Sequence, residues 1–487
     1  MSAEIFKYCV LILYVGLTFF LSWVGMKRTS DLRGFSVGNK DMSPYLVGIT
    51  LAASISSTAT FVINPGFVYV HGLSAFLHFG VAASLGILTA FIVLSKGFYR
   101  LGDKNGAITI PSWIYHRYGN RSFSFFFAII NLLSITFVVL ILVGCSLLLS
   151  GMFPVSQKVA LILVLLFVFS YVLMGGTYAH AYTNTMQGIM MMIITLLLVV
   201  HGVKYLDAGF LNSLNRVGEN YASIFNKQSE LYYDLFSVFG SGFIVTFALM
   251  LQPHILTKVL YLKNEGEINK FIITTAIVGF IFSLMLMIGF YARLSGVETV
   301  SVSQDSVLIQ YLISEFTNKP VGEYILVFIF ITLLAAGMST LDGILVSLSA
   351  MVVNDIYMPV SGENNKSRAL LISRVVLVIV GVLAAVIAWN PPQLVGLFAQ
   401  KGVYGLAAAS VVPVLFGVLV RDKFPYWIVY VAALNGLLMH LVLNLLFGVK
   451  NPAVSASYAI LVSMIFALLC IRLFRLGWLP KQLCKVP

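Results

Sequence analysis

The chain carries a succession of apolar stretches, each long enough to cross a lipid bilayer as a helix. Such a helix needs roughly 20 mostly apolar residues, and 60% of the 487 residues are hydrophobic while 10% are charged. The sequence therefore predicts an all-α polytopic membrane protein in which 1–487 form a single membrane domain. The first stretch is too long for a removed signal peptide and is kept as a helix. We place thirteen spans, at 6–26, 43–71, 73–101, 122–152, 156–175, 182–206, 234–256, 270–293, 323–356, 367–389, 392–419, 425–447 and 453–477.

Basic residues gather in alternate breaks between these spans. They cluster at 27–40, 96–121, 258–270, 366–374, 421–423 and after 472. Because cytoplasmic loops carry the excess of Lys and Arg, we expect the N-terminus outside and the C-terminus in the cytoplasm, across the cell (plasma or inner) membrane. The net charge of +12 thus reflects the bilayer and gives no indication of nucleic-acid binding. Nothing in the sequence requires an oligomer.

Two of the predicted spans are interrupted. Span 43–71 has five hydroxyl residues from 54 to 60, followed by Asn64-Pro65-Gly66, and span 234–256 contains "FGSGFIVTFALMLQPH". An interrupted helix frees backbone groups, which hydrocarbon tolerates only where protein, a cavity or an ion satisfies them. Broken helices at matching positions of two halves are typical of an inverted-repeat secondary transporter. We predict repeats at 43–206 and 234–419, with 1–42 and 425–477 peripheral.

Residues 335–340, in span 323–356, read "AAGMST". Small residues in membrane helices commonly serve close packing. Beside the broken middle of span 43–71, however, their hydroxyls and the freed carbonyls would form a hard, oxygen-only set of low net charge. Such a set suits an alkali cation. We therefore expect a monovalent ion between these two spans.

Four segments, spread from about 35 to 420, read "NPGFVYVHGL", "YTNTMQGIMMM", "LQPHILTKVLYLKNEGEINK" and "LLAAGMSTLDGILVSLSAMVVNDIY". Together they resemble the sodium/solute symporter family, in its pantothenate/monocarboxylate-like branch. The resemblance implies a 5+5 inverted-repeat (LeuT-like) core and sodium-coupled import of a small organic solute by alternating access. It also implies a Na+ site made by the carbonyls of Ala52, Ile55 and Ala336 and the hydroxyls of Ser339 and Thr340.

Asp342 is an acidic residue inside an apolar run, about one helical turn from Ser339 and Thr340. Family members with a second sodium site place an Asp near the start of the sixth span, where this chain has Asn184. A carboxylate inside a membrane costs at least about 2–3 kcal/mol and is usually paired or functional. We expect Asp342 and Asn184 to face each other in a second cation site or a proton-titrating site. The alternative is that neighbouring Ser, Thr and Asn groups satisfy Asp342, which then only stabilises the bundle.

The substrate pocket is expected among small, aromatic and hydroxyl side chains, which do not match the many hydroxyls of a sugar. We predict a small organic carboxylate, held by exposed helix-end amides and by Lys401. Lys401 can equally reach the outer headgroups, and His78 can simply bond a neighbouring helix. A sodium-coupled amino-acid (proline-like) or sugar symporter is the alternative. The expected lining is Ser56, Ser57, Ala59, Thr60, Phe76, Leu77, His78, Phe79, Phe239, Ser241, Phe243, Thr246, Gln400, Lys401 and Tyr404.

An enzyme is not predicted. The seven histidines show no i, i+4 pairing with a Glu, and no nucleophile elbow occurs. A transporter-fold sensor without transport is a further alternative. Such sensors typically carry signalling domains, and the tail of about ten residues after the last span is far below domain size.

Overall fold

The computed structural model describes residues 3–297, 304–317, 319–362, 366–392, 394–420, 422 and 424–478. Within these residues the regular secondary structure is helical, apart from one isolated parallel β-bridge between Met42 and Leu262. Ten of the described helices are long and apolar enough to cross a membrane, and two further helix pairs pass the same test together but are sharply bent. The predicted all-α, multi-pass fold is confirmed. Four predicted basic positions, Arg421, Lys423, Lys481 and Lys485, lie outside the described residues.

The α-helices are α1 (Ala3–Met26), α2 (Leu32–Ser36), α3 (Pro44–Ile55), α4 (Asn64–His71), α5 (Leu73–Phe76), α6 (Ala83–Asn105), α7 (Ile110–Tyr118), α8 (Arg121–Asn131), α9 (Ile135–Met152), α10 (Gln157–Gly202), α11 (Phe210–Val217), α12 (Glu219–Ala222), α13 (Ser241–Leu249), α14 (Pro253–Leu256), α15 (Ile268–Ser283), α16 (Met287–Leu294), α17 (Val307–Phe316), α18 (Gly322–Met351), α19 (Met358–Ser361), α20 (Lys366–Ala388), α21 (Val395–Leu419), α22 (Tyr426–Leu445) and α23 (Pro452–Arg475). Short π-helical turns are η1 (Ala59–Ile63), η2 (Leu77–Ala82), η5 (Phe236–Gly240) and η10 (Val352–Tyr357). The 3₁₀ turns are η3 (Leu132–Ser134), η4 (Val203–Leu206), η6 (Thr257–Tyr261), η7 (Glu265–Glu267), η8 (Leu284–Leu286) and η9 (Gln304–Ser306).

Helix α10 contains two of the predicted spans, which meet at Gly176. This residue has φ 51° and ψ −130°, which is not helical. Tyr14 of α1 contacts both halves, because its ring lies 6.2 Å from that of Phe167 and its hydroxyl accepts a 2.8 Å hydrogen bond from Gln187. The two halves therefore lie alongside each other. A Cβ at position 176 would clash with Phe35, so only glycine fits this turn. Counting α10 twice and each bent pair once recovers the thirteen predicted spans.

The bent pairs turn at polar residues. The first, Pro44–Ile55 with Ala59–His71, bends by 56°, and the second, Phe236–Leu249 with Pro253–Tyr261, bends by 69°. The first bend falls at 56–58, ahead of the Asn64-Pro65-Gly66 segment that the sequence singled out. Pro65 instead lies where the π-helical turn η1 passes directly into α4, so it does not end the helix. Likewise the second bend falls at 250–252, directly before Pro253, and not at the Gly/Ser stretch.

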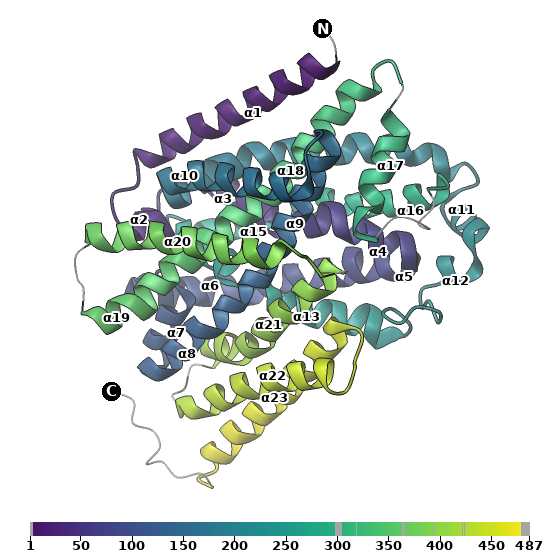
Figure 1. Ribbon diagram of the computed structural model, residues 1–487. Coiled ribbons are helices and arrows are strands. Elements are labelled where there is room, and N and C mark those ends of the chain that lie inside the picture. The colour runs from purple at the N-terminus through teal and green to yellow at the C-terminus, as the bar shows by residue number, and fades with distance from the viewer. Residues whose placement is uncertain are drawn as a thin grey trace.

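Helices α18 and α21 are the most enclosed of the long described helices, each with 78% of its apolar window buried. Helix α18 lies at the first break. It packs against α9, α10 and α3 (Figure 1). Helix α1 runs along α10 at one margin of the molecule, and α22 and α23 lie together at another (Figure 1). The break in the first bent pair is thus enclosed by α9, α10 and α18, away from the lipid.

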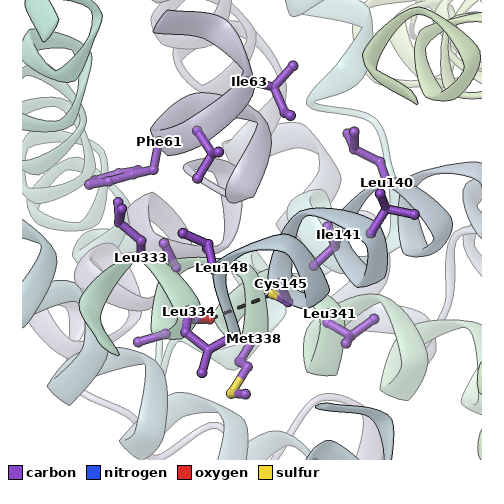
Figure 2. Close-up of a cluster of buried hydrophobic side chains, with 14 of the residues drawn as sticks. Phe61, Ile63, Leu140, Ile141, Cys145, Leu148, Leu333, Leu334, Met338 and Leu341 are labelled. Carbon is purple, nitrogen blue, oxygen red and sulfur yellow. Dashed lines mark hydrogen bonds between the residues drawn. The ribbon is translucent and has the colours of Figure 1, made fainter. Parts of the chain in front are cut away.

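An apolar seam holds α18 against η1 and α9 beside this break (Figure 2). Figure 2 shows side chains from η1, from α9 and from α18 pointing toward one another, with the Cys145 thiol 3.9 Å from the Leu334 carbonyl. Glycines permit the close approach, because a Cβ on Gly144 or on Gly337 would clash with Thr58. The labelled members of the seam are Phe61, Ile63, Leu140, Ile141, Cys145, Leu148, Leu333, Leu334, Met338 and Leu341.

Glu315 of α17 anchors the end of α10. Its carboxylate accepts hydrogen bonds from Lys204, Lys319 (2.7 Å), Tyr205 (2.5 Å) and His201 (3.0 Å). Burial alone would raise its pKa, but these four donors together hold the pKa of Glu315 well below its usual range.

Candidate cation and substrate site

The end of α3 meets the middle of α18 through backbone carbonyls. The Ser339 hydroxyl lies 3.0 Å from the carbonyl oxygen of Ala53 and 2.8 Å from that of Ala336, and the Thr340 hydroxyl donates to the carbonyl of Ser54 at 2.9 Å. Because α3 ends here, its last carbonyls lack donors from their own helix. The two hydroxyls of α18 take that role. We call this group of buried oxygens the hydroxyl–carbonyl junction.

Three of the five predicted sodium ligands, Ala336, Ser339 and Thr340, lie at the junction. The predicted carbonyls on α3 were those of Ala52 and Ile55, whereas the structure turns the hydroxyls toward the two carbonyls between them. The Ala52 carbonyl accepts a 3.0 Å bond from the Ser56 amide. All these carbonyls belong to the last turn of α3, so a small rotation of that turn changes which of them face α18.

The junction offers neutral, hard oxygen atoms. A hydroxyl that donates to a carbonyl can rotate its proton away and then present a lone pair beside that carbonyl. Together the two hydroxyls and the freed carbonyls would match the oxygen ligands that hard cations prefer. Among the described residues, no group of three or more His, Cys, Asp or Glu side chains is placed to hold a softer metal.

Asp342 and Asn184 do not touch each other, because His180 lies between them. Nδ1 of His180 is 2.8 Å from the Asp342 carboxylate, while the Asn184 amide approaches Nε2 of the same ring at 3.5 Å. Asn184 instead donates to the Ser339 carbonyl at 2.7 Å and to Ser54 Oγ at 3.0 Å. Its own Oδ1 is buried without a hydrogen-bond partner in the described part of the chain.

Lys258 is the residue that sequence reasoning misplaced. It was counted in a basic cluster between spans, but it is fully buried on η6, with Nζ 2.5 Å from Nε2 of His180. The second bent pair runs on past Pro253, through α14 and η6, as far as Tyr261. The sequence did contain a signal for this burial, because Lys258 follows Pro253 by only five residues and so lies close to the interruption of that span.

A cavity of about 600 Å³ lies against both breaks. Most of its lining is apolar, and no lining residue is Asp, Glu, Lys or Arg. Gln252 and His254, at the second break, are buried and line the cavity, and neither Gln252 Oε1 nor His254 Nε2 has a hydrogen-bond partner among the described residues. Such unsatisfied buried groups commonly await a ligand or water. The other polar lining residues are Ser54, Ser56, Thr60, Asn64, Ser84, Thr246, Thr275, Ser283, Gln400 and Tyr404.

The structure brings about half of the expected pocket residues to this cavity. Those that line it are Ser56, Ala59, Thr60, Phe76, Phe79, Thr246, Gln400 and Tyr404. Those that do not are Ser57, Leu77, His78, Phe239, Ser241, Phe243 and Lys401.

Two of the absent residues have other roles. His78 Nδ1 lies 3.0 Å from the carbonyls of Ser237 and Val238, which ties η2 to η5. The Lys401 side chain is exposed, and its carbonyl lies 3.0 Å from His440 Nε2. Sequence reasoning missed Gln252 and His254, although both stand in the quoted "LQPH" segment of an interrupted span.

The known proteins similar to this chain include sodium-coupled symporters. The sodium:solute symporter family profile matches residues 35–423. The sodium/pantothenate symporter of Escherichia coli (strain K12) is 24% identical over 421 residues, which are 84% of each chain. A sodium/proline symporter of Staphylococcus saprophyticus is 25% identical over 401 residues, covering 79% of this chain and 75% of that one.

Solved structures agree on the fold. A Na+-coupled sialic acid symporter in an outward-open state aligns with a TM-score of 0.76 at 17% identity, covering 95% of this chain and 97% of that one. Mhp1, a nucleobase-cation-symport-1 family transporter, aligns with a TM-score of 0.58 at 13% identity, covering 90% and 92%. The fold is therefore of the LeuT type, as the resemblance implied. With a family profile that spans most of its length, this chain belongs to the sodium:solute symporter family, and it is a sodium-coupled transporter and not an enzyme.

Proposed function

We propose that this symporter imports a small organic carboxylate, of the pantothenate or monocarboxylate type, across the cell membrane by alternating access. The observation that carries the proposal is the cavity at the two breaks, with its buried and unpaired polar groups and its lack of acidic side chains. The membrane orientation that we propose remains N-terminus outside and C-terminus in the cytoplasm, from the distribution of basic residues.

The proposed sodium site is the hydroxyl–carbonyl junction, drawn from Ala336, Ser339, Thr340 and the last turn of α3, including Ala52 and Ile55. An ion bound there would hold α18 against the break in the first bent pair. Because Ser54, Ala52 and Ile55 also line the cavity, the ion and the substrate would share one wall. Sodium would then favour the substrate-competent state through its differential affinity for that state.

A carboxylate fits the cavity better than a sugar or an amino acid does. Ser56, Ala59 and Thr60 line the cavity where a helix restarts. The Ser56 and Ala59 amides already donate to the Ala52 carbonyl and to Ser57 Oγ, but the hydroxyls of Ser56 and Thr60 can donate to an anion. The buried His254 adds a ring nitrogen without a partner. The ammonium of an amino acid would find no acidic lining residue, and a sugar needs more polar side chains than this lining supplies.

Proline is the second candidate, because a proline symporter is among the similar proteins. It is itself a small carboxylate, so the anion-binding half of the proposal would be unchanged. A sensor without transport is not favoured, since the similar proteins named above are symporters.

Uptake into liposomes that contain the purified protein tests the proposal. Labelled pantothenate, propionate, proline and glucose are compared under an inward sodium gradient and under an equal potassium gradient. We expect sodium-dependent uptake of a carboxylate that lacks an ammonium group. Sodium-dependent uptake of proline alone, or of glucose alone, would contradict the carboxylate assignment while leaving the sodium coupling intact.

Gln252→Leu supplies the matched variant for the cavity. It removes an amide that faces the cavity, and loss of one hydrogen bond to a charged group should raise the half-saturating substrate concentration about tenfold. Gln228→Leu, at an exposed residue outside the cavity, should leave that concentration unchanged.

A further inference from the structure

Two side chains of opposite charge are enclosed in the centre of the molecule. Asp342 of α18 and Lys258 of η6 are each 0% exposed. A lone charge in a membrane interior is costly, so buried charges in such proteins are paired with each other or with backbone groups. Asp342 lies on the central helix α18 and Lys258 on the second bent pair, and the His180 ring of α10 lies between them.

That ring connects them in a single defined way. An ammonium group has only donors, so Lys258 Nζ, 2.5 Å away, must donate to Nε2 of His180. The proton of the neutral ring is then on Nδ1, which donates to the Asp342 carboxylate at 2.8 Å. The order Lys258, His180, Asp342 therefore places a positive and a negative charge at the two ends of one hydrogen-bonded chain.

Donors complete the surroundings of the Asp342 carboxylate. The amide of Gly343 donates to it at 2.7 Å, and the Tyr171 hydroxyl donates at 3.2 Å. With His180, these make three N–H or O–H groups aimed at one carboxylate. A sodium ion needs oxygen lone pairs, and of these three groups only Tyr171 has an oxygen to offer. The carboxylate is thus held by donors, unlike the oxygens of the hydroxyl–carbonyl junction.

We propose that Lys258 is a tethered cation that neutralises Asp342 through His180, so that this symporter binds one sodium ion, at the hydroxyl–carbonyl junction, and none at Asp342. The number of ions rests on the proposed sodium site, whereas the pairing of Lys258 with Asp342 does not. In this chain the Lys258 ammonium takes the place that a second sodium ion would have near Asp342.

The pair also joins the moving parts of the site. His180 lies within 3.4 Å of Ser54 Oγ, and the Asn184 amide links that hydroxyl to the Ser339 carbonyl. A continuous polar path therefore runs from the second bent pair, through α10, to both sides of the sodium site. Lys258 is a positioning residue in this path, because it acts on the junction through His180.

The first arm of the test counts ions. Equilibrium binding of radioactive sodium is measured on purified full-length protein for the wild type, Asp342→Asn and Thr340→Val. We expect one ion per protein in both the wild type and Asp342→Asn, and weakened binding in Thr340→Val. Two ions in the wild type and one in Asp342→Asn would overturn the inference.

The second arm measures the charge pair in potassium buffer without sodium. We expect Lys258→Met and Asp342→Asn each to lower the melting temperature, and the double variant to recover most of the loss because it buries no unpaired charge. Lys263→Met removes an exposed charge five residues away and should match the wild type. A double variant no more stable than either single variant would refute the pairing, and so would a Lys258→Met protein as stable as the wild type.

The two arms separate the ideas. Normal sodium affinity in Thr340→Val would contradict the proposed sodium site, whereas the charge pair is tested separately by the melting temperatures of the variants. If a single variant does not accumulate, accumulation of the double variant still supports the pairing, and its failure contradicts it.

Discussion

Replacing Thr340 with Val removes one predicted sodium ligand while keeping the shape of the side chain. In the structure this hydroxyl donates to the Ser54 carbonyl at 2.9 Å, in a fully buried setting. The substitution therefore weakens both the ion-bound and the ion-free states. The effect on sodium affinity is the difference between these two losses.

Loss of an oxygen that contacts a charged group costs about 1.5–3 kcal/mol, whereas loss of an ordinary hydrogen bond costs about 0.5–1.5 kcal/mol. The difference of roughly 1–2 kcal/mol corresponds to a half-saturating sodium concentration that is about 5- to 30-fold higher. Sodium-dependent melting of the purified protein reports this concentration without a known substrate, because a ligand that binds only the folded state raises the melting temperature.

Two controls make the measurement specific. Thr340→Ser keeps the hydroxyl and should stay near the wild type. Thr195→Val makes the same change at another fully buried Thr, whose hydroxyl donates to the Met191 carbonyl at 2.7 Å within α10. If Thr340→Val and Thr195→Val both bind sodium within twofold of the wild type, the hydroxyl of Thr340 is not a ligand and the reasoning fails.

Three other predictions concern packing and charge. Gly337→Ala should lower the free energy of unfolding by about 1–3 kcal/mol by overpacking, because the new methyl group would clash with Thr58 where α18 meets the break. Thermal melting measures this loss, and an unchanged melting temperature would contradict the close packing. Gly176→Ala should reduce the yield of folded protein, since this position has φ 51° and no room for a Cβ beside Phe35. Size-exclusion chromatography measures this yield, and a normal yield would argue against the tight turn in α10. Glu315→Gln should lower the melting temperature at pH 7, and this deficit should shrink below about pH 4. The lowered pKa of Glu315 gives stability that is present above the unfolded-state pKa and is lost as the pH falls. A deficit of equal size at pH 7 and below pH 4 would exclude this origin.

The polar path from Lys258 to Ser339 suggests how the two bent pairs act together. Its hydrogen bonds connect η6, α10, α3 and α18, and the proposed sodium site lies at its end. Breaking the path at His180 would separate the second bent pair from the junction without touching a proposed ligand. If the path couples ion binding to a rocking motion, breaking it should weaken that coupling.

The sequence alone determined the helical membrane architecture, and the hydroxyl residues of the proposed ion site were predicted from it. Apolar stretches of membrane length must become helices, because hydrocarbon leaves no other partner for backbone groups. Polar interruptions in two of them marked the breaks, and Ser339 and Thr340 identified the helix that meets the first break. These features are local, so composition and order were enough to predict them.

Tertiary structure decided which groups meet. His180 and Asp342 are 162 residues apart in the chain, and only the packing of α10 on α18 brings them to 2.8 Å. Helix packing elsewhere buried Lys258 and left Lys401 exposed, and the contact of α3 with α18 brought the carbonyls of Ala53 and Ser54 to the hydroxyls. These choices depend on the bend angles and rotations of whole helices. Such rotations follow from the sum of many side-chain contacts, and no short stretch of sequence carries that sum.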